Sequence, residues 1–265
     1  MSELMQKGKR FLKTKTFRII KVFLISLLAL LLVFFIGLRI YFEQNKDSIM
    51  TDINQKINDN IAGHVSIGDI GYKFLIGFPN FTVVLNKVEV RDSLYAIHKR
   101  SALKAEEIEV RLNVLSLLKK KVNIEKVVLI DTKIDLYKDK NGLSNTNIRK
   151  PKPKTNKPKS DTDIQIGEID FKNVVFISQN VQRNKMFHFE VASLKSKIHY
   201  TDDGFETDLF LDVFAKSMAF NTKHGSFIKD KRVKGKLAVQ FSKAKNRIDV
   251  VTEDLGIGED DFNIK

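Results

Sequence analysis

The nine-residue stretch FETDLFLDV, residues 205–213, decides the fold class of this chain. Phe205, Leu209, Leu211 and Val213 share one parity, and acidic residues occupy three of the four positions of the opposite parity between Phe205 and Val213. Side chains of a β-strand alternate between the two faces of a sheet. The stretch therefore predicts a strand with one apolar and one polar face.

The same period of two recurs on both sides of this stretch. It marks Val65–Ile67, Phe81–Leu85, Val88–Val90, Ile108–Leu112, Val128–Ile130, Ile134–Leu136, Ile164–Ile166, Phe187–Val191 and Val233–Phe241. Short polar connections such as Thr201–Gly204 and Lys243–Asn246 separate several of these segments, as β-hairpins require. Residues 113–121 alternate too little for a strand and are predicted to form a short helix or turn. The chain is expected to be mainly β.

An uncharged segment, Val22–Leu38, lies near the N-terminus. Its seventeen residues would span about 26 Å as a helix, close to the ~30 Å hydrocarbon core of a bilayer. We expect residues 19–42 to form a transmembrane anchor helix. The alternatives are a buried core helix and a cleaved signal peptide, and the bulky residues that follow Gly37 disfavour cleavage.

Charges around this segment predict its orientation. Seven Lys or Arg residues and one Glu lie in residues 1–21, whereas Arg39 and Lys46 follow the segment among Glu43, Asp47 and Asp52. By the positive-inside rule, residues 1–18 are a basic cytoplasmic tail and the body of the chain lies across the membrane from it.

The chain beyond the anchor divides at a Lys- and Pro-rich segment, residues 146–163. Isoleucines at 49, 53, 57 and 61 predict a short amphipathic helix that opens a first β region, residues 43–145. Residues 146–163 contain three of the four prolines and are expected to form an extended linker. Residues 164–265 form a second β-rich region, which we expect to be truncated because the last residues resemble the start of another strand.

Composition excludes several classes of function. The net charge of +14 resides mainly in residues 1–21 and 148–160, each +6, which leaves +2 for the remainder (14 − 12). The basic linker has no interleaved aromatic residues, so nucleic-acid binding is not expected. Cys is absent, and no hydrolase, nucleotide-binding or zinc motif occurs. We expect no enzyme activity, no catalytic residues, no metal and no cofactor.

Residues 22–145 contain an ordered series of motifs. After the uncharged segment come GHVSIGDI at 63–70, Phe78-Pro79, NKVEV at 86–90, a strand with a Leu-rich end at 105–118, IEKVVLID at 124–131, and residues 134–145 ending in GLSN. In this order and spacing they resemble the N-terminal region of the AsmA family.

This resemblance implies a function as well as a fold. It implies a protein of the inner membrane of a diderm bacterium, with its body in the periplasm, that takes part in outer-membrane biogenesis. The family is related to TamB-type bridge-like lipid-transfer proteins, which implies a curved antiparallel sheet forming an apolar groove that shields or passes phospholipid acyl chains. Periodicity alone favours a closed core, and the resemblance favours the open groove. Candidate groove residues are Ile108, Val110, Leu112, Ile134, Leu136, Phe187, Phe189, Phe205, Leu209, Leu211 and Val213.

Two alternatives remain open at this stage. The chain could be a single-pass envelope scaffold whose β region binds another periplasmic or membrane protein through an exposed strand edge. It could also be a periplasmic hydrolase, which would need titratable side chains converging in a pocket.

Overall fold

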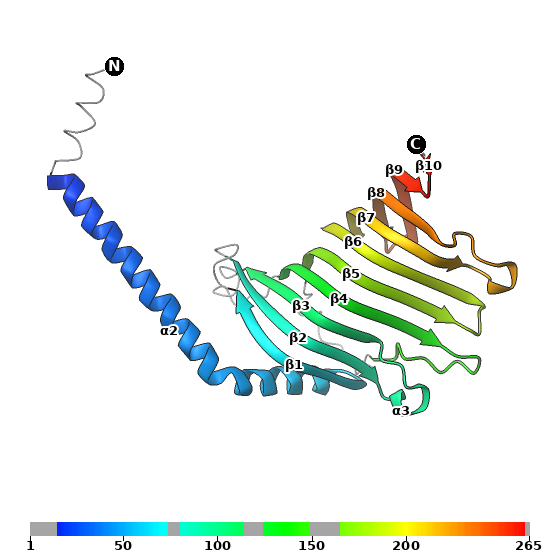
Figure 1. Ribbon diagram of the computed structural model, residues 1–265, viewed down its shortest axis with the longest axis horizontal. Coiled ribbons are helices and arrows are strands. Elements are labelled where there is room, and N and C mark those ends of the chain that lie inside the picture. Colours follow the sequence, from blue (N-terminus) through cyan, green and yellow to red (C-terminus); the bar gives the residue numbers. More distant parts are fainter. Residues whose placement is uncertain (1–14, 74–79, 114–123, 149–164, 263–265) are drawn as a thin grey trace, which may run out of the picture. The chain divides into compact units, whose positions relative to one another are not determined.

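The computed structural model describes residues 15–73, 80–113, 124–148 and 165–262. Within these residues, two helices, one 3₁₀ turn and ten strands follow one another (Figure 1). They are α2 (Lys15–Asn60), β1 (Gly63–Lys73), β2 (Asn80–Asp92), α3 (Tyr95–His98), β3 (Leu103–Asn113), β4 (Ile124–Lys138), β5 (Ile166–Asn180), β6 (Lys185–Thr201), β7 (Gly204–Ala219), η1 (Thr222–His224), β8 (Lys231–Ser242), β9 (Arg247–Ile257) and β10 (Asp260–Phe262).

Some predicted elements lie outside the described residues. These are residues 1–14 of the basic tail, the Phe78-Pro79 turn, nearly all of the predicted helix or turn at 113–121, and residues 149–163 of the linker.

Helix α2 joins two segments that the sequence analysis treats separately. Its 46 residues contain the uncharged segment and the first three isoleucines of the stripe, and Ile61 follows the end of the helix. Residues 1–51 belong to one compact unit, and the last turns of α2 belong to a second unit, residues 52–265. Large apolar side chains of α2, among them Phe23, Leu30 and Val33, are exposed. Among the described residues, no helix combines the length and the apolar character that crossing a membrane requires.

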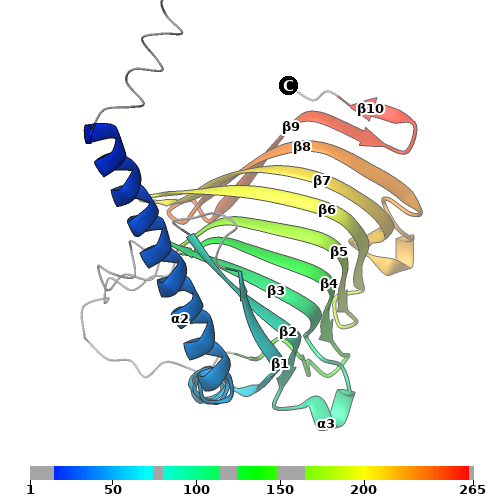
Figure 2. The same ribbon diagram turned by 60° about the vertical axis from the view of Figure 1, so that its left-hand side comes forward.

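The ten strands form one sheet in chain order, with β1 and β10 at its two edges. Neighbouring strands are antiparallel except β4 and β5, which are parallel. The two predicted β regions therefore join as a single sheet across the parallel pair. The sheet is curved and does not close on itself (Figure 2), so the prediction of a mainly β chain with an open, curved sheet is confirmed.

A buried asparagine holds the loop that leaves β4. Asn145 is 0% exposed. Its side-chain amide donates to the carbonyl of Asp135 at 2.6 Å, and its carbonyl oxygen accepts the N–H of Tyr137 at 2.7 Å. Because both partners lie in β4, the loop is folded back along the strand before the chain crosses to β5.

A line of irregular residues crosses the first six strands at mid-length. We call this line the crease; its members are Gly68, Lys87, Glu106, Asp131, Asn173 and Ala192, which lie opposite one another in the pairing register. Lys87, Asp131 and Asn173 have φ of 52°, 48° and 54°, in the left-handed region. The Asn173 side chain also donates to the carboxylate of Asp131 at 2.6 Å. Each of these strands carries one extra residue at the crease, where its alternation changes parity; between β6 and β7, where Ala192 has no opposite residue, the extra residue is a β-bulge.

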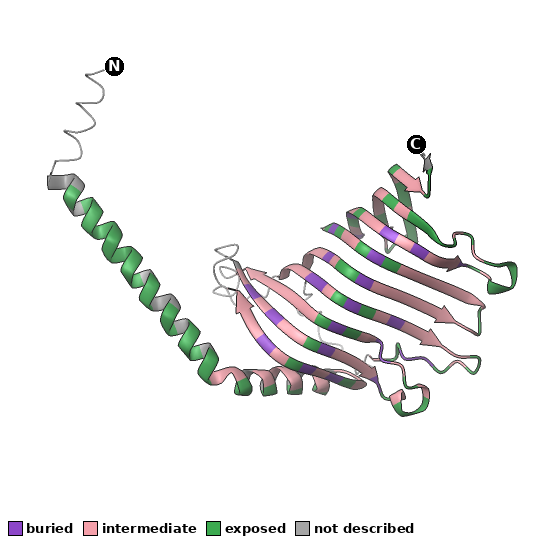
Figure 3. Ribbon diagram, in the orientation of Figure 1, coloured by how far each residue is buried: buried purple, intermediate pink, exposed green. Residues whose placement is uncertain are grey.

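A cluster of buried side chains crosses the middle of the sheet from β4 to β7. Leu129, Val174, Val191 and Val213 form one cluster, against which half-buried side chains of β3–β7 pack. Figure 3 shows buried positions as separate bands within a sheet whose residues are mostly half-buried. Among the described elements, each strand makes its main contacts with its neighbours in the sheet, so no second layer covers either face.

Candidate functional site

One face of the sheet is apolar along its whole middle; we call it the apolar face. A row of directly paired residues crosses seven strands on it: Ile70, Leu85, Ile108, Leu129, Phe171, Leu194 and Leu211. Paired residues of adjacent strands point to the same side of a sheet. The row is therefore a continuous apolar band from β1 to β7.

The crease keeps a second band on the same face. On its other side lies the row Ile67, Val88, Ala105, Thr132, Val174, Val191, Val213 and Val233. In β4 the side chains of the apolar face sit at odd positions before Asp131 (Val127, Leu129) and at even positions after it (Ile134, Leu136), yet Leu129 and Ile134 pack in one cluster. A regular strand would send these two residues to opposite faces. Because Asp131 is an extra residue, the alternation of side chains shifts by one position there, and Leu129 and Ile134 point to the same face.

The structure places all eleven predicted groove residues on the apolar face. Ile134, Phe189, Leu211 and Val213 belong to the cluster or pack against it. The others share its face through alternation and through direct pairs such as Leu136 with Ser178 and Leu209 with Leu237. Val213 is buried and the other ten are half-buried. They come from β3, β4, β6 and β7.

Several residues of the apolar face were missed by the sequence analysis. Phe171, Phe176 and Leu194 lie in segments whose alternation is interrupted at the crease, so no regular period marks them. Phe176 stacks on Phe189 with ring centroids 6.3 Å apart. The missed signal was the Asp or Asn at the interruption, because these two residue types tolerate positive φ better than most.

The opposite face is polar and pairs its own charges. Lys73 contacts Glu107 and Glu109, and Lys126 lies 3.1 Å from Glu168 and 2.6 Å from Asp170. Burial alone would lower the pKa of Lys126, but its contacts with the two carboxylates outweigh burial and raise that pKa. These contacts pair opposite charges of different strands on the polar face.

The Glu89 carboxylate is the most perturbed group on this polar face. Burial alone would raise its pKa, but hydrogen bonds from Arg91, Ser101 and Lys104 outweigh burial and lower the pKa to about 2. Glu89 is therefore ionised at any physiological pH and anchors the start of β3 to β2.

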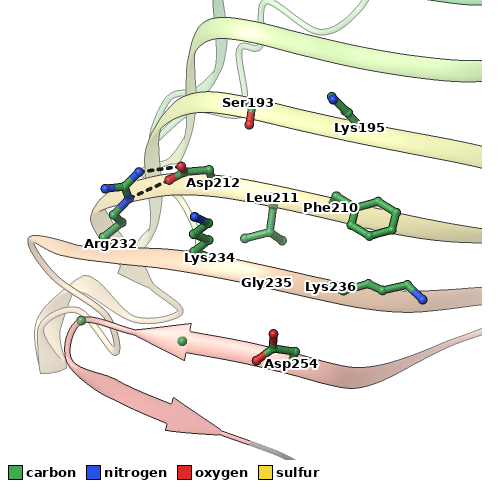
Figure 4. A pocket seen from close by; sticks show the side chains of 12 residues that line it. Ser193, Lys195, Phe210, Leu211, Asp212, Arg232, Lys234, Gly235, Lys236 and Asp254 are labelled. Atoms are coloured by element: carbon green, nitrogen blue, oxygen red, sulfur yellow. Dashed lines mark hydrogen bonds and ion pairs between the residues drawn. The ribbon is translucent and has the colours of Figure 1, made fainter.

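A hollow of about 890 Å³ lies over β6–β9 on the polar face (Figure 4). The Arg232 guanidinium donates to both carboxylate oxygens of Asp212, at 2.7 and 2.6 Å. Lys195, Lys234, Lys236 and Asp254 line the rest with Phe210. Four cations and two carboxylates suit polar or ionic groups, and Leu211 also lines the hollow.

The two edges of the sheet differ. At β1, the Asn58 side chain from the last turn of α2 accepts the N–H of Val65 at 2.7 Å and donates to its carbonyl at 2.9 Å. The other edge is less covered, because β10 pairs only with residues 255–257 of β9. Ile248, Val250 and Val251 of β9 are exposed.

Comparisons with known proteins bear on these features. No curated protein matches the chain. A protein-family comparison matches the AsmA family over residues 14–258. The match thus covers the uncharged segment and strands β1–β9, well beyond the residues that carry the sequence motifs. The chain belongs to the AsmA family.

Proposed function

We propose that this chain is an envelope protein that shields phospholipid acyl chains along its apolar face and takes part in outer-membrane biogenesis. Family membership is consistent with an envelope role. The observation that carries the lipid-handling role is the apolar face itself, because no described element covers it.

The size of the apolar face supports a ligand rather than chance exposure. Seven strands at a ~4.8 Å spacing span about 29 Å, and the stretch from Val127 to Leu136 spans about 30 Å at ~3.3 Å per residue. The resulting area of roughly 900 Å² exceeds the few hundred Å² that soluble monomers usually expose in one patch. An apolar face of this extent is a candidate site for an apolar ligand.

An acyl chain has the right length and chemistry. One leaflet contributes about half of a ~30 Å hydrocarbon core, so a single chain fits within the face in either direction. Burial at ~25 cal/mol per Å² holds it without a covalent step or a specific hydrogen bond. Headgroups would stay in water at the edge, so the proposed role needs no catalytic residue.

We also propose that the uncharged part of α2 attaches the chain to the inner membrane, with the sheet in the periplasm. The support is the charge pattern and the exposure of residues such as Phe23 and Leu30 on α2. Because the chain has no Cys, Lys140→Cys introduces a single thiol in an exposed loop. An impermeant maleimide should label it in cells with a permeabilised outer membrane; labelling only after lysis would refute this placement.

The lipid contact is testable at three consecutive residues of β7. A photoreactive amino acid at Leu209 or Leu211 probes the apolar face, whereas the same amino acid at Phe210 probes the polar face. Phe210 is 51% exposed, so it is accessible to lipid and controls for crosslinking that depends on exposure alone. We expect phospholipid crosslinks from Leu209 and Leu211 and none from Phe210. Equal crosslinking at all three, or none on the apolar face, would refute the proposal.

A second function is favoured by the outer edge of β9. Residues 247–251 of β9 pair with β8 on one side and with no other strand of the described chain. A strand of another envelope protein could add there. This scaffold function predicts protein crosslinks from Ile248 and Val250 together with no lipid crosslinks from the apolar face.

A further inference from the structure

The loop between β7 and β8, residues 220–230, carries two exposed phenylalanines at one end of the sheet. Phe220 is 54% exposed and Phe227 is 79% exposed, the highest value among the large apolar side chains described. Single exposed apolar residues are common. The meaning of this pair therefore depends on how the loop is held and on what surrounds it.

Hydrogen bonds fix the loop in place. The Thr222 N–H donates to the carbonyl of Asn184 in the neighbouring turn at 2.6 Å, and the hydroxyls of Ser217 and Ser226 lie 2.6 Å apart. The Phe227 N–H donates to the carbonyl of Met218 at 2.8 Å. Phe227 is thus presented to solvent by an ordered backbone, so its exposure is a property of the fold.

The loop continues the apolar face. Phe187, one of the predicted groove residues, meets Phe220 edge to face with ring centroids 5.4 Å apart. Phe187 also pairs with Met218, which in turn forms a bridge with Ile228. Apolar side chains therefore run without a break from the sheet past the end of β7.

The loop is also basic. Lys223, Lys229 and Lys231 are exposed, and none of them has an ion pair within the described chain. Residues 220–231 contain these three lysines and Asp230, a net charge of +2 (3 − 1). Exposed aromatic rings beside unpaired lysines match the chemistry of a bilayer surface, where rings enter the interface and lysines contact anionic headgroups.

We propose that Phe220, Lys223, Phe227, Lys229 and Lys231, together the lip, form a contact site for an anionic lipid bilayer. Charge complementarity and continuity with the apolar face select a bilayer rather than a protein as the occupant. Where the proposed lipid-handling function holds, the lip gives acyl chains an apolar path between that bilayer and the sheet. The lip deepens that function, but bilayer contact can be measured separately.

A single-cysteine label tests the contact directly. The full chain, held in a phosphatidylcholine nanodisc, carries an environment-sensitive fluorophore on Phe227→Cys, or on Ala244→Cys as the control. Ala244 lies in the turn between β8 and β9, which also has two lysines but no aromatic residue. Vesicles of phosphatidylcholine and phosphatidylglycerol that contain quencher lipids are then added.

We expect these vesicles to blue-shift and quench the label at 227 but not at 244, and high salt to reverse the change. Vesicles of phosphatidylcholine alone should have a much weaker effect. No response at 227, or an equal response at 244, overturns the proposal. A response at 227 to an envelope protein but not to vesicles also overturns it.

Unlabelled variants test which residues act. Phe227→Ser should weaken co-flotation of the nanodisc with anionic vesicles by about tenfold, since burying one aromatic side chain gives about that factor. Each lysine near an anionic bilayer contributes roughly fivefold or more to binding. The double variant Lys229→Glu with Lys231→Glu should therefore weaken co-flotation by more than about tenfold. Phe210→Ser, which removes an exposed ring from the polar face, should have no effect. Wild-type flotation of both lip variants would refute the lip.

The lip and the lipid-handling function fail in different ways. Lipid crosslinks from Leu209 and Leu211 together with no vesicle response at Phe227 would refute the lip alone. A vesicle response at Phe227 with no crosslinks on the apolar face would refute lipid handling and leave the lip as a membrane-docking site.

Discussion

Replacing one apolar pair should remove lipid without unfolding the sheet. Leu209 and Leu237 pair directly between β7 and β8 on the apolar face, and neither packs against the buried cluster. We take about 40 Å² of each leucine as covered by lipid, and the lipid loses an equal area. The two contacts together then remove about 160 Å² of apolar surface from water. At ~25 cal/mol per Å² this burial contributes about 4 kcal/mol to lipid binding. Leu209→Asn with Leu237→Asn should therefore weaken lipid binding by about a thousandfold.

The assay measures phospholipid that co-purifies with the full chain, quantified per mole of protein, with circular dichroism as the test of folding. The control pair is Phe210→Asn with Lys236→Asn, which lies one residue along on the same two strands and points to the polar face. We expect the apolar pair to lose its lipid and the control to keep it. A folded apolar-pair variant that retains wild-type lipid would refute the reasoning.

Three further predictions concern the sheet itself. Asn173→Val should lower the free energy of unfolding by about 2 kcal/mol more than Asn173→Gly, because a β-branched side chain is strained at positive φ; urea midpoints measure the difference. Asn145→Ala should cost about 2–4 kcal/mol, since it leaves two backbone groups of β4 without partners, and equal midpoints for variant and wild type would contradict this. The pKa of Glu89 is lowered from 4.5 to about 2, so its contribution to stability is complete above pH 4.5 and is lost as pH falls toward 2. Glu89→Gln should flatten the stability profile in that window, and an unchanged acid profile would argue against the hydrogen-bond network around Glu89.

Alternation in the sequence was sufficient to predict the strands and the face on which the candidate residues lie. It works for this part of β7 because residues 204–215 pair with β8 without a register shift, so Phe205 and Val213 keep one parity. The pattern was also correct in β3 and β6, where each predicted set lies entirely on one side of the crease.

The crease and the strand order could not be predicted from the pattern. Asp131 and Asn173 are residue types that accept positive φ, but Lys87 carries no such signal. The parallel pairing of β4 with β5 depends on how the chain crosses between Lys138 and Ile166, which no local period records. The lip was missed because FNTKHGSF reads as an ordinary polar loop, and only the structure places Phe220 against Phe187.

The crease also constrains how this sheet can change in evolution. Deleting Asp131 alone would restore a regular alternation in β4, but it would misalign that strand with Glu106 on one side and Asn173 on the other. The extra residue therefore cannot be lost from one strand at a time. Single-residue gaps near these positions should be rare among relatives, and where one occurs, the adjacent strands should show matching gaps.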